Sequence, residues 1–501
     1  MSEGSKPTLA DLAERFNLCL IHRDAAHAQL RPNHISLNAA ESREGGIFAA
    51  LPGTRTHGAK FAADSAASAI LTDDAGLAHL ESDHRPVLVA EDVRAVLGPI
   101  SSLVFGEPSK KLNIIGITGT SGKTTTTYLL EAICRSMGYH TGLIGTTGTR
   151  INGEPLETAL TTPEAPKLQE LFATMVERGV THVVMEVSSH AIALGRVAGT
   201  DFNVRGFTNL SQDHLDFHHS MEEYFEVKAS FFEEADPATC VVTTDDEWGK
   251  KLAARTGAHT VGEGGEFEET GIETHRDGSQ VFTFRRGDVS WHVGLDLPGR
   301  FNVQNAALAL ACVAVDGMPL SNAVNAIAHV KAPGRLERID VGQDFLAVVD
   351  YAHKPAAVKA VLEALRGEIS GRLGIVLGAG GDRDHGKRPI MGAAAVYGAD
   401  CVIITDDNPR SEDPADIRAQ VLSGATRALI ELSMKSDRKV EVMECGDRAE
   451  AIRKAVAWAR PGDAIVIAGK GHETGQQIGD TKIHFDDREE LRAALLERPH
   501  Q

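Results

Sequence analysis

Residues 114–125 read I-I-G-I-T-G-T-S-G-K-T-T, and this stretch predicts a strand, a glycine-rich loop and a helix in succession. The apolar, β-branched run ends at Ile117, and apolar residues at 129, 133 and 137 then repeat at four-residue spacing. Gly138 stands where such a helix commonly ends. A loop of this kind turns backbone N–H groups toward a phosphate chain at the positive end of a helix dipole. The stretch therefore predicts an α/β fold that binds a phosphate chain.

The side chains of the loop favour ATP as the ligand. Lys123 can reach the terminal phosphates, and the hydroxyl of Thr124 can bind Mg²⁺. One position departs from the usual Walker pattern, because Ile117 stands where the first glycine is expected and Gly119 is the loop glycine instead. An ordinary tight strand–helix turn is the alternative, and the G-K-T-T start of the helix argues against it.

Length and charge limit the classes of function. A chain of 501 residues exceeds one ordinary hydrophobic core, so we expect about three domains. The net charge is −19, with 70 acidic against 51 basic residues, which argues against non-specific binding to nucleic acid or a membrane surface. A local basic cluster can still bind an anionic substrate.

Cysteine usage and hydropathy predict a cytoplasmic protein. The six cysteines form no C-x-x-C pair, and most lie in apolar runs, as buried thiols do in a reducing compartment. Residues 1–7 are polar and do not resemble a signal peptide. The longest apolar run, residues 306–315, is too short and alanine-rich for membrane insertion.

Strand-like and helical stretches alternate in the middle and last parts of the chain. Strand-like runs lie at 143–145, 182–187, 204–207 and 240–243, and again at 345–349, 373–377, 401–405, 440–443 and 464–468. This alternation predicts parallel sheets. Composition divides the chain near residues 110 and 335, with short strands and alanine-rich helical stretches in the first part.

Four polar, glycine-marked loops follow strands of the last region. Their sequences are D-Y-A-H (350–353), G-A-G-G-D-R-D-H-G-K-R (378–388), D-D-N-P-R (406–410) and G-K-G-H-E (469–473). In open α/β sheets, ligands bind beyond the carboxyl ends of the strands. Any one loop could be a solvated turn, but four at one edge predict a site for a small, multiply charged substrate.

Two stretches of the middle region are candidates for metal binding. Glu186 ends a strand of the sheet that carries the phosphate loop, where a Mg²⁺-binding carboxylate is needed. Residues 213–216, D-H-L-D, place two acids and an imidazole within four residues. A solvated turn and a capped helix start are the respective alternatives.

With these pieces in view, the chain resembles the Mur ligase family, which builds the peptide of bacterial cell-wall precursors. The resemblance is carried by G-T-S-G-K-T-T (119–125), E-V-S-S-H (186–190), N-L-S-Q-D-H-L-D-F-H (209–218), F-N-V-Q-N (301–305), P-G-R (333–335) and D-Y-A-H (350–353). It implies an N-terminal UDP-binding domain (1–110), a central P-loop ATPase-like domain with a parallel sheet (111–335) and a C-terminal Rossmann-like, amino-acid-binding domain (336–501).

The resemblance also implies which residues surround the nucleotide and its metal ions. For ATP these are Gly119, Thr120, Ser121, Gly122, Lys123, Thr124, Thr125, Asn302, Asn305, Arg335 and Asp350. Two Mg²⁺ ions would be held by Thr124, Glu186, His214 and a carbamylated Lys228. Lys228 lies in the helical stretch 221–233, where a plain surface lysine is the alternative; carbamylation would turn this cation into an anion beside the metal ions.

The substrate residues implied for the UDP-muramoyl dipeptide are Ala39, Thr161, Thr162, Ser188 and Arg196. The first domain departs from the family pattern. Asn38, Ala39 and Ala40 stand where relatives usually carry an Asp-Ser-Arg triplet that contacts uridine. Leu194 replaces a glutamine of some relatives.

Other motifs are similar to those of family members that add the third amino acid. They are T-T-P (161–163), G-D-R-D-H-G-K-R-P (381–389), D-N-P-R (407–410) and G-K-G-H-E (469–473). These imply meso-2,6-diaminopimelate as the second substrate, held by Arg383, Asp407, Asn408, Pro409, Arg410, Gly469 and Glu473. Arg410 is the candidate for gripping the far carboxylate in a bidentate way, and a solvated loop arginine is the alternative.

The implied reaction is that of an ATP-dependent acid–amino-acid ligase acting as a monomer. The γ-phosphoryl group would pass to the D-glutamate carboxylate, and the amine would then attack the acyl phosphate. A lysine-adding ligase of the same family and a P-loop NTPase that couples hydrolysis to motion remain alternatives. A folylpolyglutamate synthetase shares the fold, but the D-N-P-R loop argues against it.

Overall fold

The computed structural model describes residues 6–21, 24–53, 56–233, 235–275 and 278–498, so most of the polar stretch 1–7 lies outside the described residues. The chain forms two compact units, Met1–Thr118 with Met137–Arg205 and Gly119–Ser136 with Gly206–Gln501. The expected α/β class is confirmed, since each unit holds sheets of largely parallel strands covered by helices. The domain boundaries at 110 and 335 stay predictions.

The first unit begins with a five-stranded sheet of order β1-β5-β4-β3-β2, in which only β1 is antiparallel to its neighbour. Its strands are β1 (Cys19–Ile21), β2 (Ile35–Ser36), β3 (Ile47–Ala49), β4 (Ala69–Thr72) and β5 (Val87–Val89). Helices α1 (Leu9–Arg15) and α4 (Val93–Val104) bury Leu12 and Leu97 against one face. Two short helices, α2 (Ala25–Ala28) and α3 (Asp74–Leu77), lie in its connections.

The second sheet of this unit carries the strand before the phosphate loop. Strand β10 (His182–Glu186) lies parallel between β6 (Asn113–Thr118) and β7 (Thr141–Gly145), which places Glu186 beside Ile117. Strands β8 (Gly148–Ile151) and β9 (Glu154–Leu156) extend the sheet in antiparallel fashion. Helices α6 (Ala165–Glu177) and α7 (Ser189–Ala193) flank β10 in sequence, and β11 (Val204–Phe207) lies at the boundary of the two units.

The second unit begins with the helix after the phosphate loop, α5 (Lys123–Ser136), and Gly138, with φ +81°, follows its end as the sequence predicts. Helix α5 packs on the buried, alanine-rich α11 (Arg300–Val315) and on α12 (Leu320–Ala326). Beside them run β12 (Cys240–Thr243), β13 (His259–Val261), β14 (Phe267–Thr274), β15 (Gln280–Arg286) and β16 (Val289–Leu295). Helices α8 (Leu215–His218), α9 (Met221–Glu233) and α10 (Glu247–Thr256) complete this part.

The C-terminal sheet has the order β17-β18-β22-β19-β20-β21, and all its pairs but β17–β18 are parallel. Its strands are β17 (Glu337–Arg338), β18 (Leu346–Asp350), β19 (Leu373–Leu377), β20 (Cys401–Ile404), β21 (Glu441–Glu444) and β22 (Ala464–Ala468). The carboxyl ends of β18, β22, β19 and β20 are therefore neighbours, so the four polar loops leave one edge as predicted.

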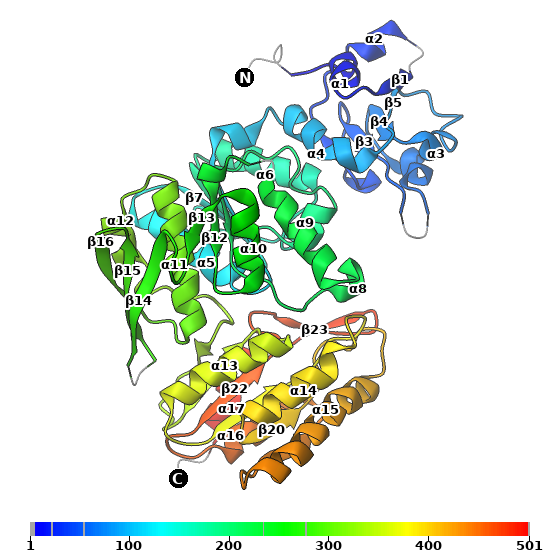
Figure 1. Cartoon of the computed structure of the whole chain (residues 1–501). Helices are drawn as coiled ribbons and strands as arrows, with labels where there is room; N and C mark the ends of the chain where they lie inside the picture. The colour runs from blue at the N-terminus through cyan, green and yellow to red at the C-terminus, as the bar shows by residue number, and fades with distance from the viewer. Residues whose placement is uncertain (1–5, 22–23, 54–55, 234, 276–277, 499–501) are drawn as a thin grey trace. The chain divides into compact units, whose positions relative to one another are not determined.

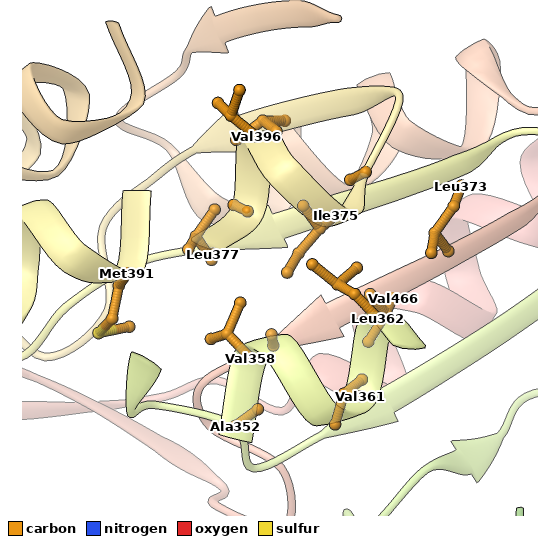
Figure 2. Packing of buried hydrophobic residues seen from close by; sticks show 14 of the residues in the cluster. Ala352, Val358, Val361, Leu362, Leu373, Ile375, Leu377, Met391, Val396 and Val466 are labelled. Atoms are coloured by element: carbon orange, nitrogen blue, oxygen red, sulfur yellow. The ribbon is translucent and has the colours of Figure 1, made fainter. Parts of the chain in front are cut away.

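Helices cover both faces of this sheet. Figure 1 shows α13 (Pro355–Glu368), α14 (Lys387–Gly398) and α15 (Pro414–Lys435) side by side on one face. In Figure 2, Val358 and Leu362 of α13 meet Ile375 and Leu377 of β19 in the core beneath them. Helices α16 (Arg448–Trp458) and α17 (Asp487–Glu497) bury the opposite face, since Ile375 and Val376 alternate between the two cores.

Two further features complete the description. A hairpin of β23 (Gly475–Ile478) and β24 (Thr481–His484) follows the last polar loop. Among the described residues, no helix is long and apolar enough to cross a membrane. The six cysteines are thiols, and all but Cys19 are buried, as their apolar surroundings predict.

Candidate active site

The phosphate loop connects Thr118 to Lys123, and two of its glycines are required by close approach. A Cβ atom on Gly119, whose φ is +140°, would lie 1.8 Å from Oγ1 of Thr208. A Cβ atom on Gly122, with φ +87°, would lie 2.2 Å from Oδ1 of Asn305. Gly119 thus serves as the loop glycine although Ile117 replaces the usual first one, and Asn305 lies against the loop as expected.

The stretch that follows β11 holds the loop in shape. Ser121 donates its backbone N–H to Oδ1 of Asn209 at 3.0 Å, and Thr120 donates its own to the Asn209 carbonyl at 2.9 Å. The Thr208 hydroxyl donates to the Ser121 carbonyl at 2.7 Å. The sequence did not predict these contacts, because they join segments about 90 residues apart and only the fold brings them together.

Two lysines that the sequence analysis assigned to the nucleotide and its metal ions converge on the loop carbonyls. Lys123 Nζ donates to the carbonyls of Gly119 and Thr120 at 2.8 and 2.9 Å. Lys228 Nζ donates to the Gly119 carbonyl at 3.0 Å, and its residue is 1% exposed, so it is not a surface lysine. Burial, and then the neighbouring Lys123, hold the pKa of Lys228 well below its ordinary value. A buried amine of low pKa is a nucleophile at neutral pH.

A third lysine, which the sequence did not single out, lies at the same place. Lys354 Nζ lies 2.7 Å from Oδ2 of Asp213 and donates to the Thr120 carbonyl at 3.1 Å. His214, at φ +53°, places Nε2 2.9 Å from the same Asp213 oxygen. Burial alone would raise the pKa of Asp213, but Lys354 and then His214 outweigh it and hold that pKa well below its ordinary value.

Arg335 connects the loop helix to the segment after β18. Its Nη2 donates to Oγ1 of Thr124 at 3.0 Å, and its guanidinium lies 4.4 Å from the ring centre of Tyr351. Asp350 accepts from the backbone N–H groups of residues 336 and 352 at 2.7 and 2.8 Å, and burial raises its pKa. Asp350 therefore shapes the backbone around Arg335. Near the loop, Asn305 Nδ2 donates to Oδ1 of Asn302 at 3.2 Å.

In the first unit, Glu186 and the predicted dipeptide residues form one cluster. Glu186 is 1% exposed and accepts from the N–H and hydroxyl of Thr146 at 2.9 and 3.0 Å. Thr146 Oγ1 lies 3.3 Å from Oγ1 of Thr161, and Thr162 donates to the Glu186 carbonyl at 2.8 Å. Ser188 donates its N–H to Oγ1 of Thr162 and caps α7 with its hydroxyl.

Arg196 joins this cluster through an ion-pair network. Its Nε lies 2.8 Å from Oε1 of Glu164, and the other Glu164 oxygen lies 3.3 Å from Nη1 of Arg94. Arg196 Nη1 also donates to the Thr162 carbonyl at 3.3 Å. Ala39 lies apart in residues 39–41, where its methyl group packs on the apolar cluster around Phe48. The structure thus groups Thr161, Thr162, Ser188 and Arg196 but not Ala39.

The loops at the edge of the C-terminal sheet bring the predicted amino-acid residues together. Asn408 Nδ2 donates to Oε2 of Glu473 at 3.0 Å, and the buried Lys470 lies 3.1 Å from the same oxygen. Asp407 lies 3.7 Å from Lys470. A Cβ atom on Gly469, at φ +123°, would lie 3.3 Å from Asp407 Oδ2. Lys470, which the sequence analysis missed, already pairs with Glu473.

Arg410 is held in the same loop cluster at an unusual backbone angle, φ +52°. Its N–H donates to the Gln477 carbonyl of β23 at 3.1 Å, and its Nη1 donates to the Gly381 carbonyl at 2.6 Å. Burial, and then Arg383, lower the pKa of Arg410. Two arginines that repel each other, one of them half-buried, form a site suited to a carboxylate.

The predicted metal ligands fit a metal ion only in part. Among the described residues, no three His, Cys, Asp or Glu side chains cluster as a metal site. Glu186 and His214 carry suitable donor atoms, whereas an unmodified Lys228 offers no oxygen atom and does not suit Mg²⁺. As a carbamate it would supply two oxygen atoms.

Comparisons with known proteins show which family the chain resembles in sequence and fold. Residues 117–313 match the Mur ligase middle domain, and residues 334–471 match the Mur ligase glutamate ligase domain. A Corynebacterium glutamicum protein named UDP-N-acetylmuramoyl-L-alanyl-D-glutamate–2,6-diaminopimelate ligase is 57% identical over 90% of this chain and 89% of its own. A Streptomyces avermitilis protein of the same name is 44% identical over 98% of this chain and 97% of its own. A solved structure with that name is 32% identical, covers 99% and 100% of the two chains, and gives a TM-score of 0.67.

Proposed function

The chain belongs to the Mur ligase family, and we propose that it is an ATP-dependent ligase that adds meso-2,6-diaminopimelate to UDP-N-acetylmuramoyl-L-alanyl-D-glutamate. The observation that carries this proposal is the identity of 57% over 90% of the chain with a relative named for this reaction. The loop edge of the C-terminal sheet supports it, because Arg410 lies half-buried in a loop there and its guanidinium would suit the far carboxylate of diaminopimelate.

The chemistry begins with activation of a carboxylate, which does not react with an amine at neutral pH. Lys123 at the phosphate loop offsets charge while the γ-phosphoryl group passes from ATP to the D-glutamate carboxylate. The resulting acyl phosphate is attacked by the amine of the amino acid, and phosphate leaves from a tetrahedral intermediate. Binding both substrates to one enzyme makes this attack effectively intramolecular.

When bound, Mg²⁺ would supply positive charge that offsets the negative charge developing on the phosphate oxygens. We infer that Glu186, His214, the Thr124 hydroxyl and a Lys228 carbamate hold two such ions. The low pKa of Lys228 supports this, because a neutral amine can add to carbon dioxide and lose a proton to give the carbamate. The carbamate is an anion, so the neighbouring charge of Lys123 would stabilise it.

The amino-acid end of the site accounts for a choice between diaminopimelate and lysine. Diaminopimelate carries an additional carboxylate at the far end of its chain. Arg410 would bind that carboxylate, while Arg383 would bind the carboxylate at the other end of the molecule and Glu473 an ammonium group there. Lys470 forms an ion pair with Glu473, which partly neutralises the carboxylate and keeps it in place.

One experiment tests the proposal. Phosphate release is measured with the UDP-muramoyl dipeptide, ATP, Mg²⁺ and a panel of amino acids, and the product is identified by mass. We expect turnover that requires both acceptor and amine and is fastest with meso-diaminopimelate. A preference for lysine would establish the lysine-adding alternative. Turnover of ATP without an acceptor would favour an NTPase that couples hydrolysis to motion.

A further inference from the structure

Lys354 connects the C-terminal sheet to the phosphate loop. It directly precedes Pro355, the first residue of α13, and its backbone is extended, as is usual before proline. Its side chain does not cap the helix but lies against Asp213 and the Thr120 carbonyl. The residue is only 8% exposed, so its ammonium group is held at a defined place.

Lys354 shares its hydrogen-bond acceptor with the lysine of the phosphate loop. Both Lys123 and Lys354 donate to the Thr120 carbonyl, at 2.9 and 3.1 Å, so their ammonium groups are at most about 6 Å apart, where like charges repel. Asp213 balances one of these charges. The positive charge that remains is suited to a polyanion at this loop.

We propose that Lys354 is a second phosphate-directed cation of the loop, a positioning residue that acts with Lys123 on the phosphates of the bound nucleotide. The inference rests on the proposed function, because it presupposes that the loop binds ATP. Asp213 keeps the ammonium group near the loop while the group exchanges the Thr120 carbonyl for a phosphate oxygen. Since Lys354 follows Asp350 and Tyr351, it also links nucleotide binding to the segment that surrounds Arg335.

The test compares Lys354→Met and Lys354→Arg with Lys359→Met as the control. Lys359 lies one turn further along α13, its side chain is 70% exposed, and it pairs only loosely with Glu363. Binding of a non-hydrolysable ATP analogue and of AMP is measured by calorimetry at two salt concentrations. We expect Lys354→Met to weaken binding of the ATP analogue at least tenfold and binding of AMP by less than threefold. The salt dependence of analogue binding should also decrease.

Steady-state kinetics separate positioning from a structural role. Lys354→Met should lower kcat/KM for ATP at least thirtyfold, leave KM for the amino acid within twofold, and retain the wild-type circular dichroism spectrum. Lys354→Arg should recover most of the affinity, because it keeps the positive charge. The inference would be overturned if folded Lys354→Met bound the analogue with unchanged affinity, or if its affinities for the analogue and for AMP fell equally. A wild-type protein that binds no nucleotide would instead contradict the proposed function.

Discussion

At the scale of single residues, Lys123 is the group on which the ATP assignment depends most directly. It donates to two loop carbonyls, and these contacts hold the ammonium group where phosphates would bind. Lys123→Ala should reduce turnover by about 10² or more, because a charge that stabilises the transferring group is lost. Turnover is measured by phosphate release, with the exposed Lys250→Ala as the control. Near-normal turnover in folded Lys123→Ala would refute the phosphate-loop assignment.

Lys228 allows a test of carbamylation that does not depend on activity. We expect wild type incubated with ¹³C-bicarbonate to show a carbamate signal by NMR, and Lys228→Ala to lack it. The substitution should also abolish most activity, small carboxylates should partly restore it, and added bicarbonate should assist only the wild type. The buried position and low pKa of Lys228 give the physical reason. Full activity of the Lys228→Ala variant would contradict a catalytic role for the carbamate.

Arg410 tests the choice of amino acid. Removing one partner of a buried charge pair costs about 2–5 kcal/mol, or roughly 30- to several-thousand-fold in kcat/KM. Arg410→Ala should lose diaminopimelate use by at least the lower factor, while the poor use of lysine changes little. The exposed Arg427→Ala on α15 serves as the control. Equal losses with both amino acids would contradict the role assigned to Arg410.

At the scale of elements, a carboxyl group in strand β14 affects stability. Glu269 is partly buried, no described residue donates to its Oε2, and burial, and then Asp245, raise its pKa to about 7. A folded-state pKa above the ordinary value of 4.5 means that the folded protein binds this proton more tightly. The contribution of Glu269 to the free energy of unfolding therefore falls as the pH rises from about 4.5 through 7.

Glu269→Gln should remove that dependence and raise the free energy of unfolding at pH 8 by ~1–3 kcal/mol, since it removes a buried charge. Thermal unfolding at pH 5 and pH 8 measures the effect. Glu273→Gln, an equal change of charge at an exposed position of the same strand, is the control. If both variants shift the midpoint of thermal unfolding at pH 8 equally, the partly buried position of Glu269 has no special effect on stability.

At the scale of the whole molecule, nucleotide binding should stabilise the fold through Arg335. This residue joins α5 to the segment after β18 by its contacts with Thr124 and Tyr351. A ligand at 100 times its Kd adds about 2.7 kcal/mol to the free energy of unfolding. An ATP analogue with Mg²⁺ should raise the melting temperature of the wild type, and Arg335→Met should lose most of that rise.

The comparison for that prediction is the exposed Arg427→Ala, which should keep the full rise in melting temperature. An equal rise in Arg335→Met would show that Arg335 takes no part in nucleotide binding.

The amino-acid sequence by itself determined the α/β class, the strands of the C-terminal sheet and the phosphate loop, because hydrophobic periodicity and glycine spacing are local properties of a chain. Parallel pairing of β18, β22, β19 and β20 followed the same local signals, and it placed the four polar loops at one edge. Helix α9 over Met221–Glu233 also lies where the sequence predicts it.

Only the tertiary structure decided which side chains complete the site. Lys354 and Thr208 carry no local signal, and each acquires its role from residues distant in sequence. Lys470 lies in the G-K-G-H-E motif, but its contact with Asn408, 62 residues away, comes from the fold. Lys228 shows the same limit, since a lysine in a helix is ordinarily exposed and only packing makes it buried. Burial and electrostatic contact depend on distances between chain segments. The order of the residues does not fix these distances, whereas the tertiary structure does.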